Sequence, residues 1–210
     1  MIQTLEQLRS LYAAPGERAR LKQLSHVDIH ARRFIALSPF CVLASGGANG
    51  RLLDASPRGG DPGFVKVLDD HTLLFPDSGG NNRLDTLENL LADPRLSLIF
   101  LLPGVDETLR VNGRARLRDE AEFVDRFAQE RQRPKLVIEI AVQELYLHCA
   151  KAFMRSRLWT PETWPDRAGL PSMNQMIRDQ LGAHLVLESE EATRARYLAQ
   201  LAQERTPDKD

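Results

Sequence analysis

"LSLIFLLPGVDETLRVNGRARL", residues 96–117, contains two β-strand patterns separated by a turn. Residues 96–102 are almost wholly apolar, which is typical of a strand inside a sheet. Residues 108–117 instead alternate along the chain, as in a strand with one buried face. The positions on that face are Leu109, Val111, Gly113, Ala115 and Leu117. The stretch therefore predicts two strands of a β-sheet.

Further strand patterns lie on both sides of this stretch. They cover residues 40–45, 51–56, 64–68, 72–75 and 135–147. The turn sequence GGANG at 46–50 favours a hairpin between the first two, because Asn-Gly is a strong hairpin signal. Few helical patterns interrupt these strands. The expected fold is therefore mainly β, a six- to seven-stranded antiparallel barrel with flanking helices.

Helical patterns lie mostly towards the two ends of the chain. Thr4 followed by Gln7 forms a capping-box pattern that predicts a short N-terminal helix. A second helix is predicted over 27–37, and it should end before Pro39, because proline disfavours the helical conformation in the residue before it. The other predicted helices cover 83–92, 120–129, 172–181 and 189–203. We expect a single domain over 1–210, with N-terminal helices at 1–34, a barrel core at 35–157 and a helical appendage at 158–203.

The composition limits the possible partners. The chain has 28 basic and 29 acidic residues, so no overall charge attracts nucleic acid or an anionic membrane. No segment has the roughly 20 apolar residues of a membrane span, and the N-terminus lacks the pattern of a signal peptide. We therefore expect a cytoplasmic protein. Cys41 and Cys149 are both expected to be buried free thiols.

Two polar loops suggest a site for an anion. The strand ending at Phe75 runs through Pro76 and Asp77 into a glycine pair and then into Asn82 and Arg83, at the start of a predicted helix. A helix N-terminus offers unpaired N–H groups and the positive end of a dipole, which together favour phosphate. The alternative is that Asn81 or Asn82 only caps the helix while Arg83 is solvated.

The second loop makes a shared site the stronger interpretation. The sequence DASPRGGDPGFVKV (54–67) places Ser56, Arg58 and Lys66 around a second glycine pair, one hairpin away from the first loop. Two small, polar and basic segments at neighbouring strand ends are typical of one concave binding site.

The ordered motifs also resemble a known family. SPFCVLAS, PGFVKVLDDHTLLFPD, the Asn-Asn-Arg helix start, LSLIFLLPG and TLRVNGRARL occur in the order found in the FMN-binding split barrel of the pyridoxamine 5′-phosphate oxidase-like superfamily. The resemblance covers about 35–157 and is strongest to a branch of uncharacterised FMN-binding proteins. It implies a homodimer that holds an FMN at each of two interfacial sites, with the flavin phosphate bound by basic residues.

The resemblance also implies roles for single residues. Val65 and Lys66 match the strand that lines the flavin and the substrate pocket. Pro76 and Asp77 match a pair beside the flavin, and Asn82 with Arg83 matches the pair that binds the phosphate. Asp61 stands where the oxidases place a phosphate-binding arginine, so this role passes to Arg58.

Three residues later in the chain are also candidates for contact with the flavin. Thr108 matches a glutamine that reaches the ring system, and Arg110 or Lys66 is a candidate for stabilising the reduced flavin anion. For Lys66 the alternative is a solvated strand lysine. Trp159 in RSRLW is a candidate for covering the flavin from the partner chain, or else an anchor that packs a helix onto the barrel. The C-terminal signature of true pyridoxamine phosphate oxidases is absent, which argues against vitamin B6 oxidation.

The histidines give no clear metal site. His148 and Cys149 lack a third ligand at metal spacing, so a strand-end histidine and a buried thiol are expected. His26 and His30 are four residues apart but lack the other groups of a zinc site, so we expect both on the surface.

Two function classes therefore remain open. The first is an FMN-dependent oxidoreductase that acts on a small molecule, with NAD(P)H as a possible reductant. The second is a flavin-binding module for storage or sensing, without turnover. A weaker third interpretation, in which the barrel binds haem or a deazaflavin, leaves His148 as the candidate haem ligand.

Overall fold

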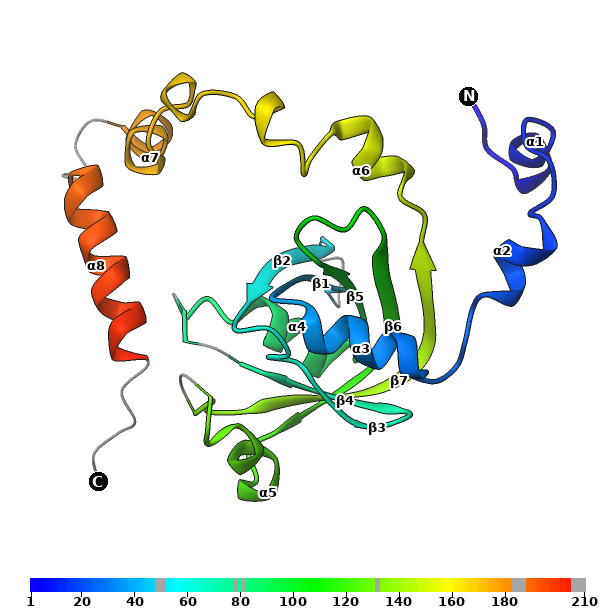
Figure 1. The fold of residues 1–210 in the computed structure, drawn as a ribbon, viewed down its shortest axis with the longest axis horizontal. Coiled ribbons are helices and arrows are strands. Elements are labelled where there is room, and N and C mark those ends of the chain that lie inside the picture. Colours follow the sequence, from blue (N-terminus) through cyan, green and yellow to red (C-terminus); the bar gives the residue numbers. More distant parts are fainter. Residues whose placement is uncertain (48–51, 78, 81, 131–132, 183–187, 205–210) are drawn as a thin grey trace.

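One curled antiparallel sheet forms the centre of the molecule (Figure 1). The computed structural model describes residues 1–47, 52–77, 79–80, 82–130, 133–182 and 188–204. Within them, seven strands are paired in the order β2-β1-β5-β6-β7-β4-β3. Their bounds are β1 Phe40–Ser45, β2 Asp54–Gly59, β3 Lys66–Asp69, β4 Thr72–Pro76, β5 Arg95–Leu101, β6 Thr108–Arg118 and β7 Val137–His148. The predicted mainly β fold is confirmed.

The two strands predicted from residues 96–117 are β5 and β6, and they pair at the middle of the sheet. Leu98 lies opposite Val111, and all three of Leu98, Val111 and Leu109 are fully buried. The predicted inward face of β6 is confirmed, because its alternate positions are buried up to Ala115. Large apolar side chains on this face supply much of the free energy that stabilises the barrel.

A β-bulge lies between Asn112 and Gly113, where the register of β6 against β7 shifts. A Cβ atom on Gly113 would lie 2.5 Å from the carbonyl oxygen of Ala141, on the neighbouring strand. Glycine is therefore required for the close approach of the two backbones.

Three strands begin two or three residues later than predicted: β2, β3 and β7, the last of which begins at Val137 instead of residue 135. The strand predicted at 51–56 is β2, which begins at Asp54 and ends at Gly59, because it pairs along the whole of β1 up to Phe40. The strand predicted at 64–68 begins only at Lys66, because a turn with Gly63 at φ 83° precedes it. The predicted Asn-Gly turn falls at residues 49–50, outside the described residues.

Most predicted helices are present, although the one predicted at 120–129 is helical only over 121–127 and the helices at 17–21 and 151–156 were not predicted. Thr4 and Gln7 form the predicted capping box, and the second predicted helix ends before Ser38 and Pro39. The bounds are α1 Leu5–Arg9, α2 Glu17–Leu21, α3 Ile29–Leu37, α4 Asp85–Ala92, α5 Ala121–Val124, α6 Lys151–Ser156, α7 Met173–Leu181 and α8 Glu190–Gln203. Short 3₁₀ segments lie at Asp125–Phe127, Pro161–Thr163 and Arg167–Gly169.

Helices α3 and α4 pack against the sheet. Helix α3 contacts β3, and α4 contacts β1, β2 and β6. Leu84, Leu87, Leu90 and Leu91 are spaced in the sequence as one apolar stripe of this second helix, but only two of them are buried. Leu87 and Leu90 are buried, but Leu84 and Leu91 are exposed, because the helix begins at Asp85 and its buried face also carries Thr86.

The two cysteines differ in their surroundings. Cys41 is completely buried in the core, and burial raises the pKa of its thiol to about 12 although Arg58 lies near. Cys149 is exposed, so the prediction of a second buried thiol is wrong. It follows the last residue of β7, where the chain leaves the sheet.

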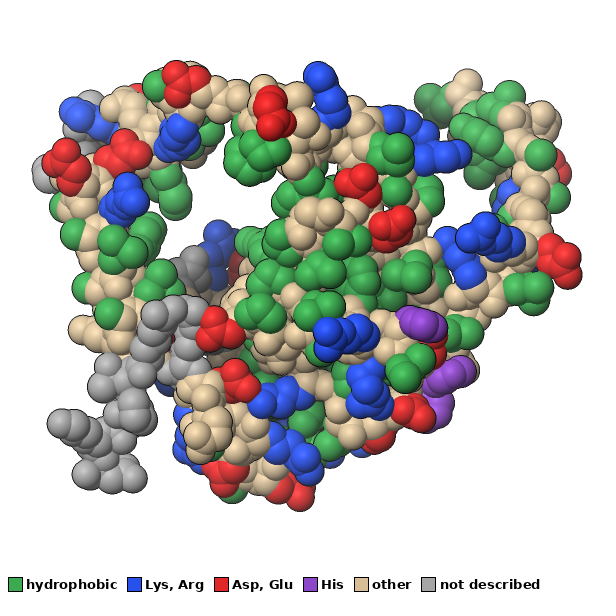
Figure 2. Space-filling model, viewed as in Figure 1, with side chains coloured by type: hydrophobic (Ala, Val, Ile, Leu, Met, Phe, Trp, Pro, Cys, Tyr) green, Lys and Arg blue, Asp and Glu red, His purple; other side chains and the backbone are tan. Residues whose placement is uncertain are grey.

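Both ends of the chain extend away from the sheet as helical arms (Figure 1). Residues 1–24 form the N-terminal arm and residues 150–204 the C-terminal arm. Hydrophobic side chains lie on both arms and across the barrel face between them (Figure 2). The exposed apolar residues of the arms include Leu5, Leu11, Leu21, Leu170, Leu181 and Leu198. In the described part of the chain, no helix combines the length and the apolar character needed to cross a membrane.

Candidate functional site

The two polar loops meet at one cavity. A cavity of about 480 Å³ lies between β2, residues 77, 79–80 and 82–84 after β4, helix α4 and residues 133, 135 and 136 before β7. Ser56 and Arg58 reach it from β2, and Asp77, Asn82 and Arg83 reach it from the other loop. The curling of the sheet thus brings together five of the predicted site residues.

Arg58 is the best-anchored cation of the cavity. Its Nε donates to Ser56 Oγ at 3.2 Å and its Nη2 donates to Thr86 Oγ1 at 3.0 Å. Its Nη1 lies 3.6 Å from Asp77 Oδ1, and only 22% of the side chain is exposed. A guanidinium held in this way is preorganised to bind phosphate with two parallel hydrogen bonds.

The glycine loop has a different geometry from the one predicted. Helix α4 begins at Asp85, not Arg83, and Leu84 at its N-cap has φ 57°. Asn82 also has a positive φ, of 59°, and does not cap the helix. Asn81 lies outside the described residues. Arg83 is 74% exposed and pairs with Asp85 at 2.9 Å.

This geometry changes the source of positive charge at the site. The first turn of α4 carries Asp85 and Glu88, whose negative charges already interact favourably with the helix dipole. An anion in the cavity would therefore be held mainly by side chains. A contribution of the helix N-terminus to anion binding stays a prediction, and these two carboxylates would reduce it.

Sequence reasoning missed several lining residues, and three of them carry donors that could bind an anion. Arg133 and Lys135 line the cavity from the segment before β7, and Thr86 lines it from α4. The basic sequence RPK (133–135) was the available signal, but only Lys135 entered a prediction, as the first residue of the strand at 135–147. Thr86 gave no signal, because it lies inside the helix predicted at 83–92.

The cavity carries charges of both signs. Its cations are Arg58, Arg83, Arg133 and Lys135, and its carboxylates are Asp54, Asp77 and Asp85. Burial raises the pKa of the Asp77 carboxyl, and the positive charges of Arg58 and Lys135 partly oppose this shift. Because burial disfavours its charged form, Asp77 keeps a proton at a higher pH than an exposed aspartate does.

A second, larger hollow adjoins the cavity and shares Ser56, Arg58 and the glycine pair with it. Its volume is about 820 Å³, and Pro57, Phe75 and Pro76 form its barrel side. The predicted residue Pro76 thus lies beside the cavity and not in it. A basic cavity next to a hollow lined by both aromatic and polar residues suits a ligand with an anionic end and a ring system.

Val65 lies just before β3, and Lys66 is the first residue of β3. Val65 is buried in the core. Lys66 Nζ forms an ion pair with Glu130 Oε1 at 2.6 Å and lies 5.0 Å from the centre of the Phe127 ring. Glu130 and Phe127 line a third, small hollow together with Pro76 and Asp77. Lys66 is thus neither solvated nor directed at the main cavity.

Thr108, Arg110 and Trp159 lie away from this cavity in the same chain. Thr108 begins β6 opposite His148, and Arg110 lies 5.9 Å from the centre of the Tyr146 ring. Trp159 stacks on Phe153 and donates from Nε1 to the carbonyl oxygen of Val105 at 3.0 Å. Within one chain, Trp159 therefore anchors the C-terminal arm to the barrel.

His148 is partly buried at the end of β7. Its Nε2 is a buried atom without a hydrogen-bond partner among the described residues. Burial lowers the pKa of this imidazole, and the nearby positive charges of Arg110 and Lys22 lower it further. No group of three metal-binding side chains occurs in the described part of the chain.

Known structures resemble the barrel region at low sequence identity. HupZ from Group A Streptococcus has a TM-score of 0.46 and 17% identity, over 57% of this chain and 91% of HupZ. A NimC/NimA family protein from Clostridium acetobutylicum has a TM-score of 0.41 and 14% identity, over 58% of this chain and 87% of its own. General Stress Protein 26 from Bacillus anthracis has a TM-score of 0.39 and 12% identity, over 57% of this chain and 94% of its own.

A match to a protein-family model shows which family the chain belongs to. No curated protein matches the chain significantly by sequence. The model named pyridoxamine 5′-phosphate oxidase matches residues 27–149, which is more than half of the 210 residues and includes the whole sheet. The chain therefore belongs to the pyridoxamine 5′-phosphate oxidase family, a group of flavin-binding proteins.

Proposed function

We propose that this protein binds FMN and acts as an FMN-dependent oxidoreductase on a small molecule. One observation carries the proposal. Ser56 and Arg58 meet Asn82 and Arg83 at a single cavity, although the two pairs come from separate parts of the chain. That cavity opens beside a hollow large enough for a ring system.

The side chains fit the two ends of FMN. Arg58, with Lys135 and Arg83, would bind the phosphate. Ser56 and Asn82 offer neutral hydrogen-bond donors in the same cavity. The apolar barrel side of the larger hollow, with Phe75 and Pro76, would lie along the flavin ring.

When bound, FMN would supply the redox chemistry, and the protein would supply binding, orientation and electrostatics. Asp77 lies where its carboxylate would repel a phosphate, but its raised pKa and its contact with Arg58 both reduce that repulsion. NADH or NADPH is the proposed reductant. The exposed thiol of Cys149 is compatible with the reducing cytoplasm.

We also propose a homodimer with the flavin site between the subunits. Thr108, Arg110 and Trp159 do not line the cavity or the hollows beside it in their own chain, so their predicted contacts with the flavin would come from a second chain. The exposed apolar side chains of both arms support this assembly, since they need cover from water.

The second candidate function is a flavin-binding module without turnover. The ion pair between Lys66 and Glu130 favours this alternative, because it occupies the lysine that we expected to bind a substrate anion. Such a module would bind FMN tightly but would not reduce it faster with NAD(P)H than free flavin is reduced.

The first experiment is a visible spectrum of the protein purified without added cofactor. Oxidised-flavin bands, with FMN released on heating at about one molecule per chain, would support the proposal. Stopped-flow mixing with NADH or NADPH then separates the two candidates, since only an oxidoreductase accelerates flavin reduction. A colourless protein that takes up no FMN on titration would refute both.

A further inference from the structure

Helix α8, at the C-terminal end, borders the proposed flavin site. Tyr197 and Gln200 line the hollow of about 820 Å³, opposite Pro57 and Phe75 of the barrel. Glu204, just after the helix, lines the smaller hollow beside it. Residues 197, 200 and 204 are spaced by three and four, so they share one face of the helix. That face is directed at the site.

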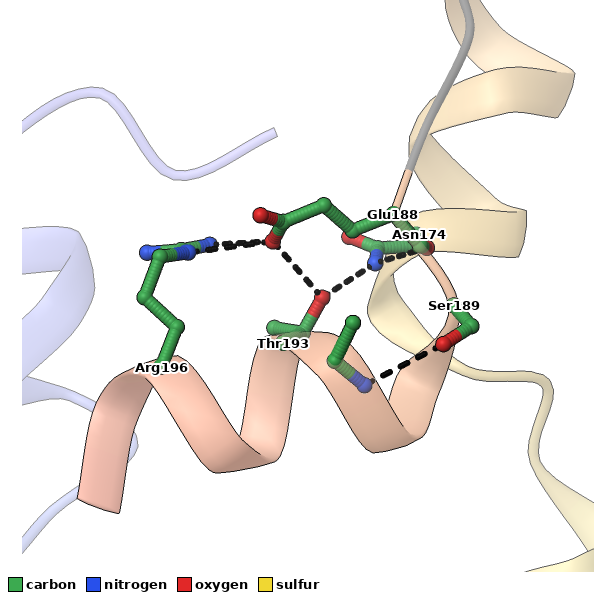
Figure 3. A network of polar contacts seen from close by, with 6 residues as sticks. Asn174, Glu188, Ser189, Thr193 and Arg196 are labelled. Carbon is green, nitrogen blue, oxygen red and sulfur yellow. Dashed lines mark hydrogen bonds and ion pairs between the residues drawn. The ribbon is translucent and has the colours of Figure 1, made fainter. Parts of the chain in front are cut away.

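A polar network fixes the start of this helix to α7 (Figure 3). Asn174 on α7 donates from Nδ2 to Thr193 Oγ1 and to the carbonyl oxygen of Glu188, both at 2.7 Å. Ser189 caps the helix by accepting a hydrogen bond from the backbone N–H of Ala192 at 3.1 Å. The network holds the first turn of α8 in place relative to α7.

The same network extends to the residue that borders the hollow. Arg196 pairs with Glu188 at 2.9 Å. Its guanidinium also lies 4.9 Å from the centre of the Tyr197 ring. Arg196 therefore restricts the Tyr197 ring on one side by a cation–π contact.

We propose that α8 forms the outer wall of the flavin site, with Tyr197 packed against the ring system of the bound FMN. This inference rests on the proposed function. A flavin ring in the hollow would have Pro57, Phe75 and Pro76 on its barrel side and Tyr197 on the side facing α8. Stacking of aromatic rings adds affinity beyond that from buried area alone.

Gln200 gives the wall a polar group. Its amide carries two N–H donors and one carbonyl acceptor, and it lies one turn after Tyr197 on the same face. The pyrimidine edge of a flavin presents both acceptors and a donor, which an amide matches. The wall would also limit the space left for a substrate, so that only small molecules reach the ring.

The test compares FMN and riboflavin binding in three variants. Tyr197→Ala is expected to weaken both ligands by about tenfold, because both contain the ring. Iodide should also quench the fluorescence of the bound flavin more strongly in this variant than in the wild type. Tyr197→Phe, which keeps the ring, should bind within about twofold of the wild type.

Gln203→Ala is the matched control. Gln203 lies on the same helix, is exposed, and does not line these hollows. Its variant should bind both flavins as the wild type does. If the wild type binds FMN and Tyr197→Ala shows unchanged affinity and iodide quenching, the wall is refuted while the proposed function stands. If the wild type binds no FMN, both are refuted.

Discussion

Replacing Arg58 by alanine should separate phosphate binding from ring binding. Arg58 is largely buried, and contacts with Ser56, Thr86 and Asp77 hold its guanidinium. Little conformational entropy would then be lost when it binds a phosphate. Removing such a charge-assisted contact costs roughly 1.5–3 kcal/mol, which corresponds to about ten- to a hundredfold in affinity for FMN. Riboflavin has no phosphate, so its affinity should change little.

Arg83 provides an internal comparison. It is 74% exposed and pairs with Asp85 in solvent. Exposed ion pairs contribute roughly 0.2–1 kcal/mol, so Arg83→Ala should weaken FMN by no more than about fivefold. The structure therefore predicts that Arg58 contributes more than Arg83, although both arginines looked equivalent in the sequence.

The assay is fluorescence titration of FMN and riboflavin against the wild type and each variant. Arg95→Ala is the matched control, since Arg95 is equally exposed, pairs with Asp93 and does not line the cavity. Circular dichroism checks that each variant is folded. Equal losses for FMN and riboflavin in Arg58→Ala would show that Arg58 supports the fold and not the phosphate. A larger effect from Arg83 would refute the argument from burial.

Three other predictions concern the fold, the titration of the site and the assembly. Gly113→Ala should destabilise the protein by roughly 1–3 kcal/mol in urea unfolding, because its Cβ would lie 2.5 Å from the carbonyl oxygen of Ala141; an unchanged midpoint would contradict the close approach at the bulge. Burial raises the pKa of Asp77, so the folded state binds this proton more tightly than the unfolded state does. The resulting gain in the free energy of unfolding is present at low pH and is lost as the pH rises through the folded-state pKa. Asp77→Asn should therefore be more stable than the wild type at pH 7, with a gain that shrinks towards about pH 4, and a gain independent of pH would argue against this titration. Light scattering at micromolar concentration should give a dimer, and a monomer that still binds FMN would exclude the interfacial site.

Part of the candidate site could be predicted from the sequence. Ser56, Arg58, Asn82 and Arg83 were selected because small, polar and basic residues beside glycines are typical of anion sites, and all four line one cavity. Lys135 and Thr86 could not be selected in this way. They lie far along the chain from β2, and they line the cavity only because the sheet curls.

The local conformation of the glycine loop also required the structure. Asn82 and Leu84 both adopt positive φ, which delays the start of α4 to Asp85. A positive φ at leucine is unfavourable in isolation, so no propensity argument would predict it. Packing of Leu87 and Leu90 against the sheet positions the helix and outweighs the unfavourable φ of Leu84.

The sequence by itself determined the strands and the capped helices, because alternation and capping depend on neighbours within a few residues. The buried face of β6 and the capping box at Thr4 are examples. Only the tertiary structure decided which distant side chains meet. Arg58 of β2 meets Thr86 of α4 because the two elements pack together on the sheet. Tyr197 borders the same site across about 140 residues of chain, on the C-terminal arm. Such contacts depend on the whole packed core and not on local pattern.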